Sequence, residues 1–205
     1  MWLVADTTDN TVDNDVTLTF VDDSVWSSRV TAVKIGNQTL DTNQYIVTNG
    51  ELTIQDGIIT TPGNYTITVE ATGYQDSSVV QTVNVGAFST SESTAVLSPN
   101  PNDWVYEPQV NVVTLTAKDQ YGNPIPNYTF RVGVEIENIG ASDITMVADG
   151  QSYTVLPDEN KSFPLANLSQ VTDANGVVTL SYHIPSGDYN AAIWVYPNDS
   201  ETAFW

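Results

Sequence analysis

Apolar residues alternate with polar ones along much of this chain, and no other feature of the sequence constrains the fold as strongly. The stretch NYTITVEA places Tyr65, Ile67, Val69 and Ala71 on one face, with polar Thr66, Thr68 and Glu70 between them. Successive side chains of a strand point to opposite sides of a sheet, so this alternation predicts strands with one buried face. The stretches DVTLTFV, NVVTLTAK and GVVTLSYHI repeat the pattern. We therefore expect an all-β protein.

Turn signals separate these stretches about every ten residues. They include Asn49-Gly50, Asp56-Gly57, Pro62-Gly63 and Asn175-Gly176. Short strands at this spacing are typical of β-sandwiches and not of alternating β- and α-elements. One helical turn is expected at DDSVWSS, where Asp22 or Asp23 can cap the helix and Trp26 can fill the core.

The segment GAFSTSEST, residues 86–94, is small, polar and without periodicity. Such composition is typical of a linker. Proline supports a boundary here, because nine of the ten prolines follow it. We expect two tandem β-sandwich domains, residues 1–87 and 94–205, held near end to end by a linker at residues 87–93.

The charge balance excludes several classes of partner. Twenty-five Asp and Glu residues face only five Lys and Arg residues, which gives a formal net charge of −20. Such a surface repels phosphate backbones and anionic lipid headgroups, so we expect no nucleic-acid or membrane partner. It attracts cations, although solubility outside the cell is the simpler reason for the composition. The absence of cysteine excludes disulfides, thiolate metal sites and cysteine nucleophiles.

No apolar stretch approaches the roughly 18 residues that span a bilayer. The start, MWLVADTTDN, lacks the basic segment and the apolar run of a signal peptide. We therefore expect an excised piece of a longer secreted protein, with Met1 as an added start.

Three elements mark the first half: Asp22-Asp23 followed by Trp26, then Gly63-Asn64-Tyr65, then Gly73-Tyr74. Residues 1–86 resemble the repeat of Gram-positive surface and secreted proteins that is named for the haemoglobin-interacting domains of a streptococcal haem-uptake receptor. The segment Asp13-Asn14-Asp15 departs from that repeat, which often has a Gly-containing turn there. By this resemblance, haemoglobin binding belongs to a minority of the family, so it is not expected here.

Two turns mark the second half: KDQYGNPIP from Lys118 to Pro126, and TDANG from Thr172 to Gly176. They resemble the turns of bacterial Ig-like domains of the invasin and intimin type. The resemblance implies an Ig-like sandwich with these turns at its corners. A long insertion around residues 135–168 exceeds what such a domain needs, and we expect extra strands or a long loop there. Modules of both families serve mainly as spacers, adhesins or parts of surface layers.

The residues do not indicate an enzyme. The single histidine, His183, lies in the predicted strand SYHIP, and no serine is set in a nucleophile elbow. There is no phosphate-binding glycine loop, and composition alone explains pairs of carboxylates. Haem ligation would use His183, a methionine or a tyrosine, and we expect these to be structural.

Calcium is the one cofactor with support. Its sites are built from six or more oxygen ligands that converge on loops. The first domain is dense in aspartates, and two loops at one end of the second could add to them. The candidate ligands are Asp6, Asp9, Asp13, Asp15, Asp22, Asp23, Asp119 and Asp173. They lack the EF-hand spacing, and a solvated acidic surface is the simpler explanation. Bound calcium could stiffen the joint between the domains.

Aromatic residues recur at alternate positions in PNDWVYEPQ and IWVYPND. Trp104 and Tyr106 share one side of the first strand, and Trp194 and Tyr196 share one side of the second. Rings at this spacing suit stacking on a sugar, but they suit a sandwich core as well. We expect core positions, whereas exposed and coplanar rings would indicate ligand binding.

These inferences predict a non-enzymatic module of a large secreted or cell-surface protein of a Gram-positive bacterium. It would act as a spacer, surface-layer or adhesin segment, with neighbouring modules or other surface proteins as partners. The alternative is a module that binds cell-wall or other carbohydrate, or a host protein, within an adhesin or a polysaccharide-degrading enzyme.

Overall fold

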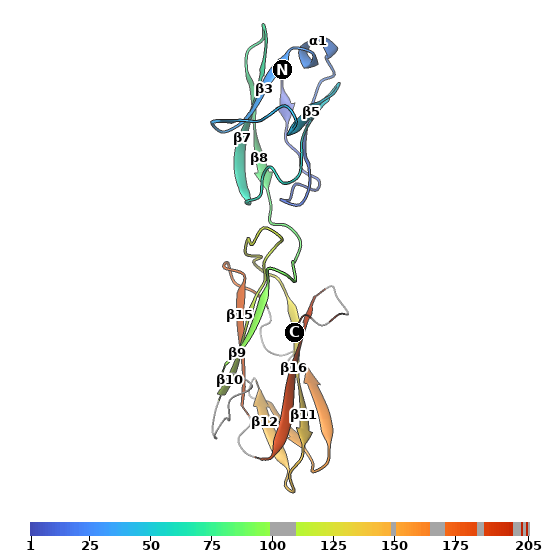
Figure 1. Ribbon diagram of the computed structural model, residues 1–205, viewed down its shortest axis with the longest axis vertical. Helices are drawn as coiled ribbons and strands as arrows, with labels where there is room; N and C mark the ends of the chain where they lie inside the picture. Colours follow the sequence, from blue (N-terminus) through green and yellow to red (C-terminus); the bar gives the residue numbers. More distant parts are fainter. Residues whose placement is uncertain are drawn as a thin grey trace. The chain divides into compact units, whose positions relative to one another are not determined.

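The structure, a computed structural model, describes residues 1–98, 110–148, 151–164, 171–183, 187–198, 202 and 204 (Figure 1). The chain divides into two compact units, Met1–Ala87 and Phe88–Trp205. Antiparallel strands make up nearly all the regular structure of both, so the all-β prediction is confirmed. In the part of the chain that the structure describes, no helix is long and apolar enough to cross a bilayer.

The first unit is a sandwich of two four-stranded antiparallel sheets. One sheet has the strand order β1 (Leu3–Val4), β2 (Val16–Phe20), β6 (Glu51–Ile54), β5 (Tyr45–Val47). The other has the order β4 (Gln38–Thr39), β3 (Val30–Ile35), β7 (Gly63–Ala71), β8 (Ser77–Val83). Ile67, Val69 and Ala71 of β7 are buried, as the alternation of NYTITVEA predicts.

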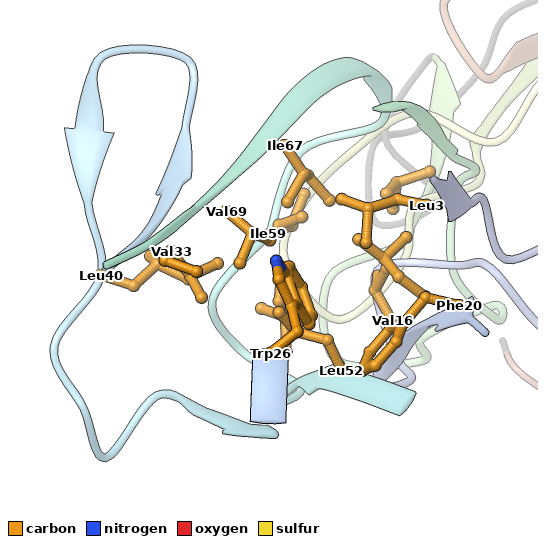
Figure 2. Close-up of a cluster of buried hydrophobic side chains, with 14 of the residues drawn as sticks. Leu3, Val16, Phe20, Trp26, Val33, Leu40, Leu52, Ile59, Ile67 and Val69 are labelled. Atoms are coloured by element: carbon orange, nitrogen blue, oxygen red, sulfur yellow. The ribbon is translucent and has the colours of Figure 1, made fainter. Parts of the chain in front are cut away.

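A short helix, α1 (Ser24–Ser27), carries Trp26 into the core of the first unit (Figure 2). Asp23 is its N-cap, and the carboxylate accepts two backbone N–H bonds of the first turn, both at 3.0 Å. The Trp26 side chain is fully buried, and its ring meets that of Phe20 edge-on with centroids 4.8 Å apart. The capped turn and its core tryptophan are therefore confirmed, and of the two possible caps the chain uses Asp23.

The second unit pairs a five-stranded sheet with a three-stranded one, both antiparallel. The larger sheet has the order β13 (Gln151–Val155), β12 (Ile144–Ala148), β15 (Val177–His183), β10 (Val110–Thr116), β9 (Thr94–Ser98). The smaller has the order β14 (Asn160–Pro164), β11 (Phe130–Asn138), β16 (Tyr189–Pro197). Leu115 and Leu180 from the larger sheet and Phe130 from the smaller are buried in its core.

The segment expected as a linker, residues 87–93, lies almost wholly in the second unit. The backbone N–H of Ser89 donates to the carbonyl oxygen of Lys118 at 2.8 Å, and the Ser93 hydroxyl accepts from the backbone N–H of Lys118 at 3.0 Å. The Phe88 ring stacks on that of Tyr128 with centroids 4.8 Å apart. The unit thus begins at Phe88 and not at residue 94. Local composition does not reveal this start, because the partners of residues 88–93 are distant in sequence.

The two turns KDQYGNPIP and TDANG are bonded to each other. The Thr172 hydroxyl donates to the carbonyl oxygen of Ile125 at 2.7 Å, and the backbone N–H of Ala117, the residue before the first turn, donates to that of Gly176 at 2.8 Å. Gly176 has φ of 73°, and a Cβ there would overlap the carbonyl oxygen of Ala117. Only glycine accepts both conditions without strain. The two motifs are therefore two sides of one corner.

The insertion around residues 135–168 forms strands, one of the two outcomes expected for it. β12 and β13 extend the larger sheet, and β14 pairs with β11 in the smaller one. The added residues thus continue both layers of the sandwich within the described ranges.

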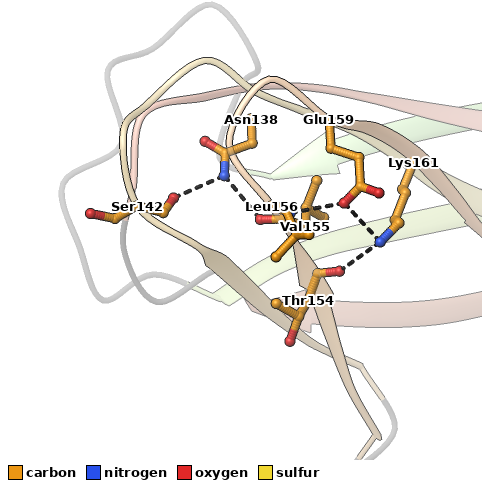
Figure 3. Close-up of polar contacts among 7 residues, drawn as sticks. All are labelled: Asn138, Ser142, Thr154, Val155, Leu156, Glu159 and Lys161. Carbon is orange, nitrogen blue, oxygen red and sulfur yellow. Dashed lines mark hydrogen bonds and ion pairs between the residues drawn. The ribbon is translucent and has the colours of Figure 1, made fainter.

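A polar network closes the tip of this insertion (Figure 3). The buried Asn138 amide donates to the carbonyl oxygens of Ser142 and Val155, each at 2.9 Å. Beside it, Glu159 and Lys161 form an ion pair with an N–O distance of 2.8 Å. These contacts join the end of β11 to the ends of β13 and β14, which holds the added strands against the sandwich.

Candidate functional site

The aspartates proposed as calcium ligands in the first unit hold separate loops. The carboxylate of Asp13 accepts the backbone N–H of Ala87 at 2.6 Å. That of Asp15 accepts the backbone N–H of Asp56 at 2.8 Å. Of the other candidate ligands in this unit, Asp9 and Asp22 are exposed and Asp23 caps α1.

Asp6 is nearly buried and ties the first strand to the rest of its unit. Its carboxylate accepts the backbone N–H of Thr17 at 3.0 Å and that of Thr8 at 3.1 Å. Its backbone N–H and carbonyl both bond the buried side-chain amide of Gln81, at 2.8 and 3.0 Å. Burial raises the pKa of the Asp6 carboxyl, but the bonds from Thr17 and Thr8 outweigh it and the net pKa is below the ordinary value. This aspartate is therefore a structural acceptor.

The two candidate ligands of the second unit organise its corner turns. Asp119 is fully buried and accepts two backbone N–H bonds within its own turn, each at 2.9 Å. Asp173 accepts the backbone N–H of Val177 at 2.9 Å and that of Asn175 at 2.8 Å, and these bonds lower its pKa. Both are Asx-type turns, which explains an aspartate at these positions without a metal.

Among the described residues, no three Asp, Glu or His side chains gather into a group that could hold a metal ion. Aspartates that are dense in sequence are thus dispersed in space, each at its own turn or cap. Calcium binding stays a prediction from composition.

The aromatic pairs have different outcomes. Trp104 and Tyr106 lie outside the described residues. Trp194 and Tyr196 lie on β16, half-buried, and the buried Val195 between them faces the core. Their ring centroids are 5.4 Å apart and the ring planes meet at 66°. The expectation of core positions is wrong for this pair, since both rings lie on the outer face, and they are edge-to-face and not coplanar.

The reason lies in the ladder between β16 and β11. Val195 pairs with Val132, and both are buried in the core of the sandwich. Trp194 pairs with Gly133, one step along the strand, and so occupies the opposite face. Both faces of β16 carry large side chains, so alternation alone could not tell which face is the inner one.

The Trp194 indole packs directly over Gly133. A Cβ at position 133 would overlap Cζ2 and Cε2 of Trp194, so the ring occupies the space above this glycine. The indole Nε1–H continues across the sheet and donates to the Ser162 hydroxyl of β14 at 3.1 Å. The ring thus starts on β16, crosses β11 and ends on β14. We call this arrangement of Trp194, Gly133 and Ser162 the indole platform.

Polar side chains surround the platform on the same face. The Asn160 amide donates to Glu135 at 2.8 Å, and the Asn190 amide donates to Glu137 at 2.8 Å. On the other side, the guanidinium of Arg131 lies 5.3 Å from the centre of the Tyr196 ring, within cation–π range.

Sequence reasoning found Trp194 and Tyr196 but missed Gly133 and Ser162. A glycine inside the alternating strand FRVGVEIEN was the available signal, since strand glycines often mark a close approach. Nothing local marks Ser162, because it reaches the platform only through the pairing of β14 with β11.

His183 ends β15, where the ladder sets it opposite Val110 of β10 and Val147 of β12. It is half-buried between apolar ladder partners. This position fits the structural role expected for it.

Comparison with known families matches residues 3–84 to the family described as "Heme-binding protein Shr-like, Hb-interacting domain". The resemblance of the first unit is confirmed. Among curated protein sequences, none matches this chain.

Several solved structures are similar to the chain. Invasin, described as a bacterial integrin-binding protein, has 18% identity and a TM-score of 0.35, over 98% of this chain and 37% of that one. The Yersinia pseudotuberculosis adhesin InvE has 20% identity and a TM-score of 0.35, over 95% of this chain and 54% of that one. The Bacteroides ovatus protein SGBP-B, solved with a mixed-linkage heptasaccharide, has 13% identity and a TM-score of 0.30, over 87% of this chain and 50% of that one.

Proposed function

We propose that the chain is a non-enzymatic structural and interaction module of a large secreted or cell-surface bacterial protein. It spaces or joins neighbouring modules as a segment of an adhesin or a surface layer. The observation that carries this proposal is the closure of two separate hydrophobic cores along one chain. Units with their own cores can stand in series without depending on the fold of their neighbours.

Two further observations support a place outside the cell, and we propose the cell surface or wall of a Gram-positive bacterium as that place. The family matched by the first unit is one of binding modules by its description. The strongly acidic composition suits a protein that stays dispersed outside the cell.

Pulling the chain by its two ends in single-molecule force spectroscopy tests the spacer role. We expect two separate unfolding events, with contour-length gains of up to roughly 30 and 40 nm at about 3.6 Å per extended residue. Both events should return after relaxation. A single event, or extension without a force peak, would contradict a mechanical role.

We also propose, from the acidic composition alone, that calcium stiffens the chain. Melting in millimolar calcium and in chelator tests this. A rise of several degrees in Tm with calcium, without the same rise in magnesium, supports it. An unchanged Tm removes calcium from the proposal while leaving the spacer role in place.

A second candidate function is a ligand-binding module within an adhesin or a polysaccharide-degrading enzyme, which takes a carbohydrate or a host protein. The observation that favours it is the half-exposed aromatic pair on the outer face of β16, where no core requires it. Co-sedimentation with purified cell wall and with insoluble polysaccharides tests it. Failure to pellet with any of them would count against this candidate without touching the first.

A further inference from the structure

We infer that the outer face of the β14-β11-β16 sheet binds an uncharged polysaccharide, with the Trp194 indole as the surface on which a sugar ring stacks. This inference rests on the second candidate function and names its site and its class of ligand.

The ring is held in place before any ligand arrives. Gly133 gives it room on the central strand, and the bond from Nε1 to Ser162 fixes its far end at 3.1 Å. The side of the ring that faces away from the sheet is then presented to solvent in one orientation. A side chain that is already ordered loses little conformational entropy on binding, which favours affinity.

The surroundings of the ring suit a polyol. Glu135 and Glu137 follow Gly133 on the same face of β11, and each carboxylate already holds an amide, from Asn160 and Asn190. Two-residue steps along a strand are roughly 7 Å, so these groups extend about 14 Å from the platform. That is long enough for more than one sugar ring, and carboxylate and amide groups supply both acceptors and donors for hydroxyls.

Charge argues for a neutral polymer. Glu135 and Glu137 are exposed beside the platform, and the chain as a whole carries a net charge of −20. Uronates or sulfated sugars would be repelled. The cation Arg131 lies two residues before Gly133 on β11, beside Tyr196, whereas Glu135 and Glu137 lie after Gly133.

The same surroundings argue against a protein partner. A protein interface buries an apolar centre around its aromatic anchors. Here the residues next to the indole on this face are Glu135, Ser162 and the small Ala192, all exposed, and the half-buried Tyr196, whose ring lies under the Arg131 guanidinium. A small aromatic surface bordered by polar groups fits the apolar face and hydroxyl edge of a sugar better than it fits a second protein surface.

Affinity electrophoresis of the full 205-residue chain tests the inference. Native gels would contain hydroxyethyl cellulose, xyloglucan, galactomannan or a mixed-linkage β-glucan, with polygalacturonate as the acidic probe. We expect at least one neutral polymer to retard the chain and polygalacturonate not to. Trp194→Ala should weaken the retardation about tenfold, the scale of one lost aromatic stack.

Gly133→Ala is the sharper variant, since it leaves every polar group and the tryptophan in the sequence. Its added methyl group occupies the space in which the indole packs. Position 133 does not have a positive φ, so alanine adds no backbone strain. It should weaken binding as much as Trp194→Ala does. Trp2→Ala is the matched control, because Trp2 is 81% exposed and lies in the other unit. It should bind like the unchanged chain.

Circular dichroism and melting would show that each variant is folded, and Ser162→Ala gives a milder second variant with an expected loss of a few fold. The inference is overturned if none of the four neutral polymers retards the chain, if polygalacturonate alone does, or if folded Trp194→Ala and Gly133→Ala bind as well as Trp2→Ala. The force experiment uses no ligand, so failure here is distinct from failure of the spacer role.

Discussion

In the first unit the tryptophan of α1, Trp26, is fully buried between the two sheets, whereas in the second unit Trp194 lies on the outside of a sheet. Trp26 enters the core from a helical turn, and its ring is enclosed by side chains of both sheets (Figure 2). Trp194 stands on a strand whose inner face is already filled by Val195. The core therefore has no place for it, and a glycine on the neighbouring strand supplies one outside.

The difference shows that a large aromatic residue can either close a core or equip a surface within the same class of fold. The residue type is the same in both units, and what differs is the space that the partner strands leave. In the first unit a ring is required for packing. In the second, the sandwich would be closed without it.

Truncating the two tryptophans should show the largest difference in stability between the two units. Trp26→Ala removes a fully buried side chain and should cost the first unit about 3–5 kcal/mol, while Trp194→Ala should cost the second less than about 1 kcal/mol. Hydrogen exchange read by mass spectrometry would assign the loss to each unit separately. Equal losses in the two variants would contradict the contrast.

High pH should destabilise the second unit. Burial raises the pKa of Tyr182 to about 12 from its ordinary value of 10.0, with a further contribution from Tyr189. The unfolded chain then ionises first as pH rises, so stability is complete below pH 10 and falls between pH 10 and 12, by up to about 3 kcal/mol. Tyr182→Phe should flatten this part of the stability curve. As a control, the stability of the first unit at high pH should be the same in Tyr182→Phe and in the unchanged chain.

Low pH should destabilise the first unit through Asp6. The folded pKa of Asp6 lies below its unfolded value of 3.8, so its contribution is present above that pH and is lost as pH falls through the folded pKa. Asp6→Ala should remove roughly 1–3 kcal/mol at neutral pH, because Thr17 and Thr8 lose their charged acceptor. It should also reduce the acid sensitivity of the unit. Acid unfolding followed by circular dichroism gives the pH at which the unit unfolds. If that pH is the same in Asp6→Ala and the unchanged chain, other carboxylates control the acid sensitivity.

The smallest effect is expected at the N-cap of α1. Asp23→Ala leaves two backbone N–H groups without their acceptor and should cost about 1 kcal/mol, whereas Asp22→Ala, one residue earlier and exposed, should cost almost nothing. Denaturant unfolding of the two variants in parallel gives the comparison. A larger cost for Asp22→Ala would mean that this exposed aspartate has a role beyond the cap.

The prediction from sequence succeeded where local chemistry decides the structure. Alternation placed Ile67, Val69 and Ala71 in the core, and the DDSVWSS pattern located a capped turn. It failed at Trp194, because Ile193 and Val195 form an equally apolar set on the other face of the strand. The glycine in FRVGVEIEN was a usable sign of a close approach, but it does not name the side chain that approaches.

By itself, then, the sequence determined the strand pattern, the turns, the capped helix and the acidic charge, since each of these depends on residues close together along the chain. Tertiary structure alone decided which face of β16 looks outward, that the two corner turns bond each other, and that Trp194, Gly133 and Ser162 meet. It also dispersed the aspartates that composition grouped together. The physical reason is that strand pairing joins residues far apart in sequence, and a shift of one residue in that pairing exchanges the two faces of a strand.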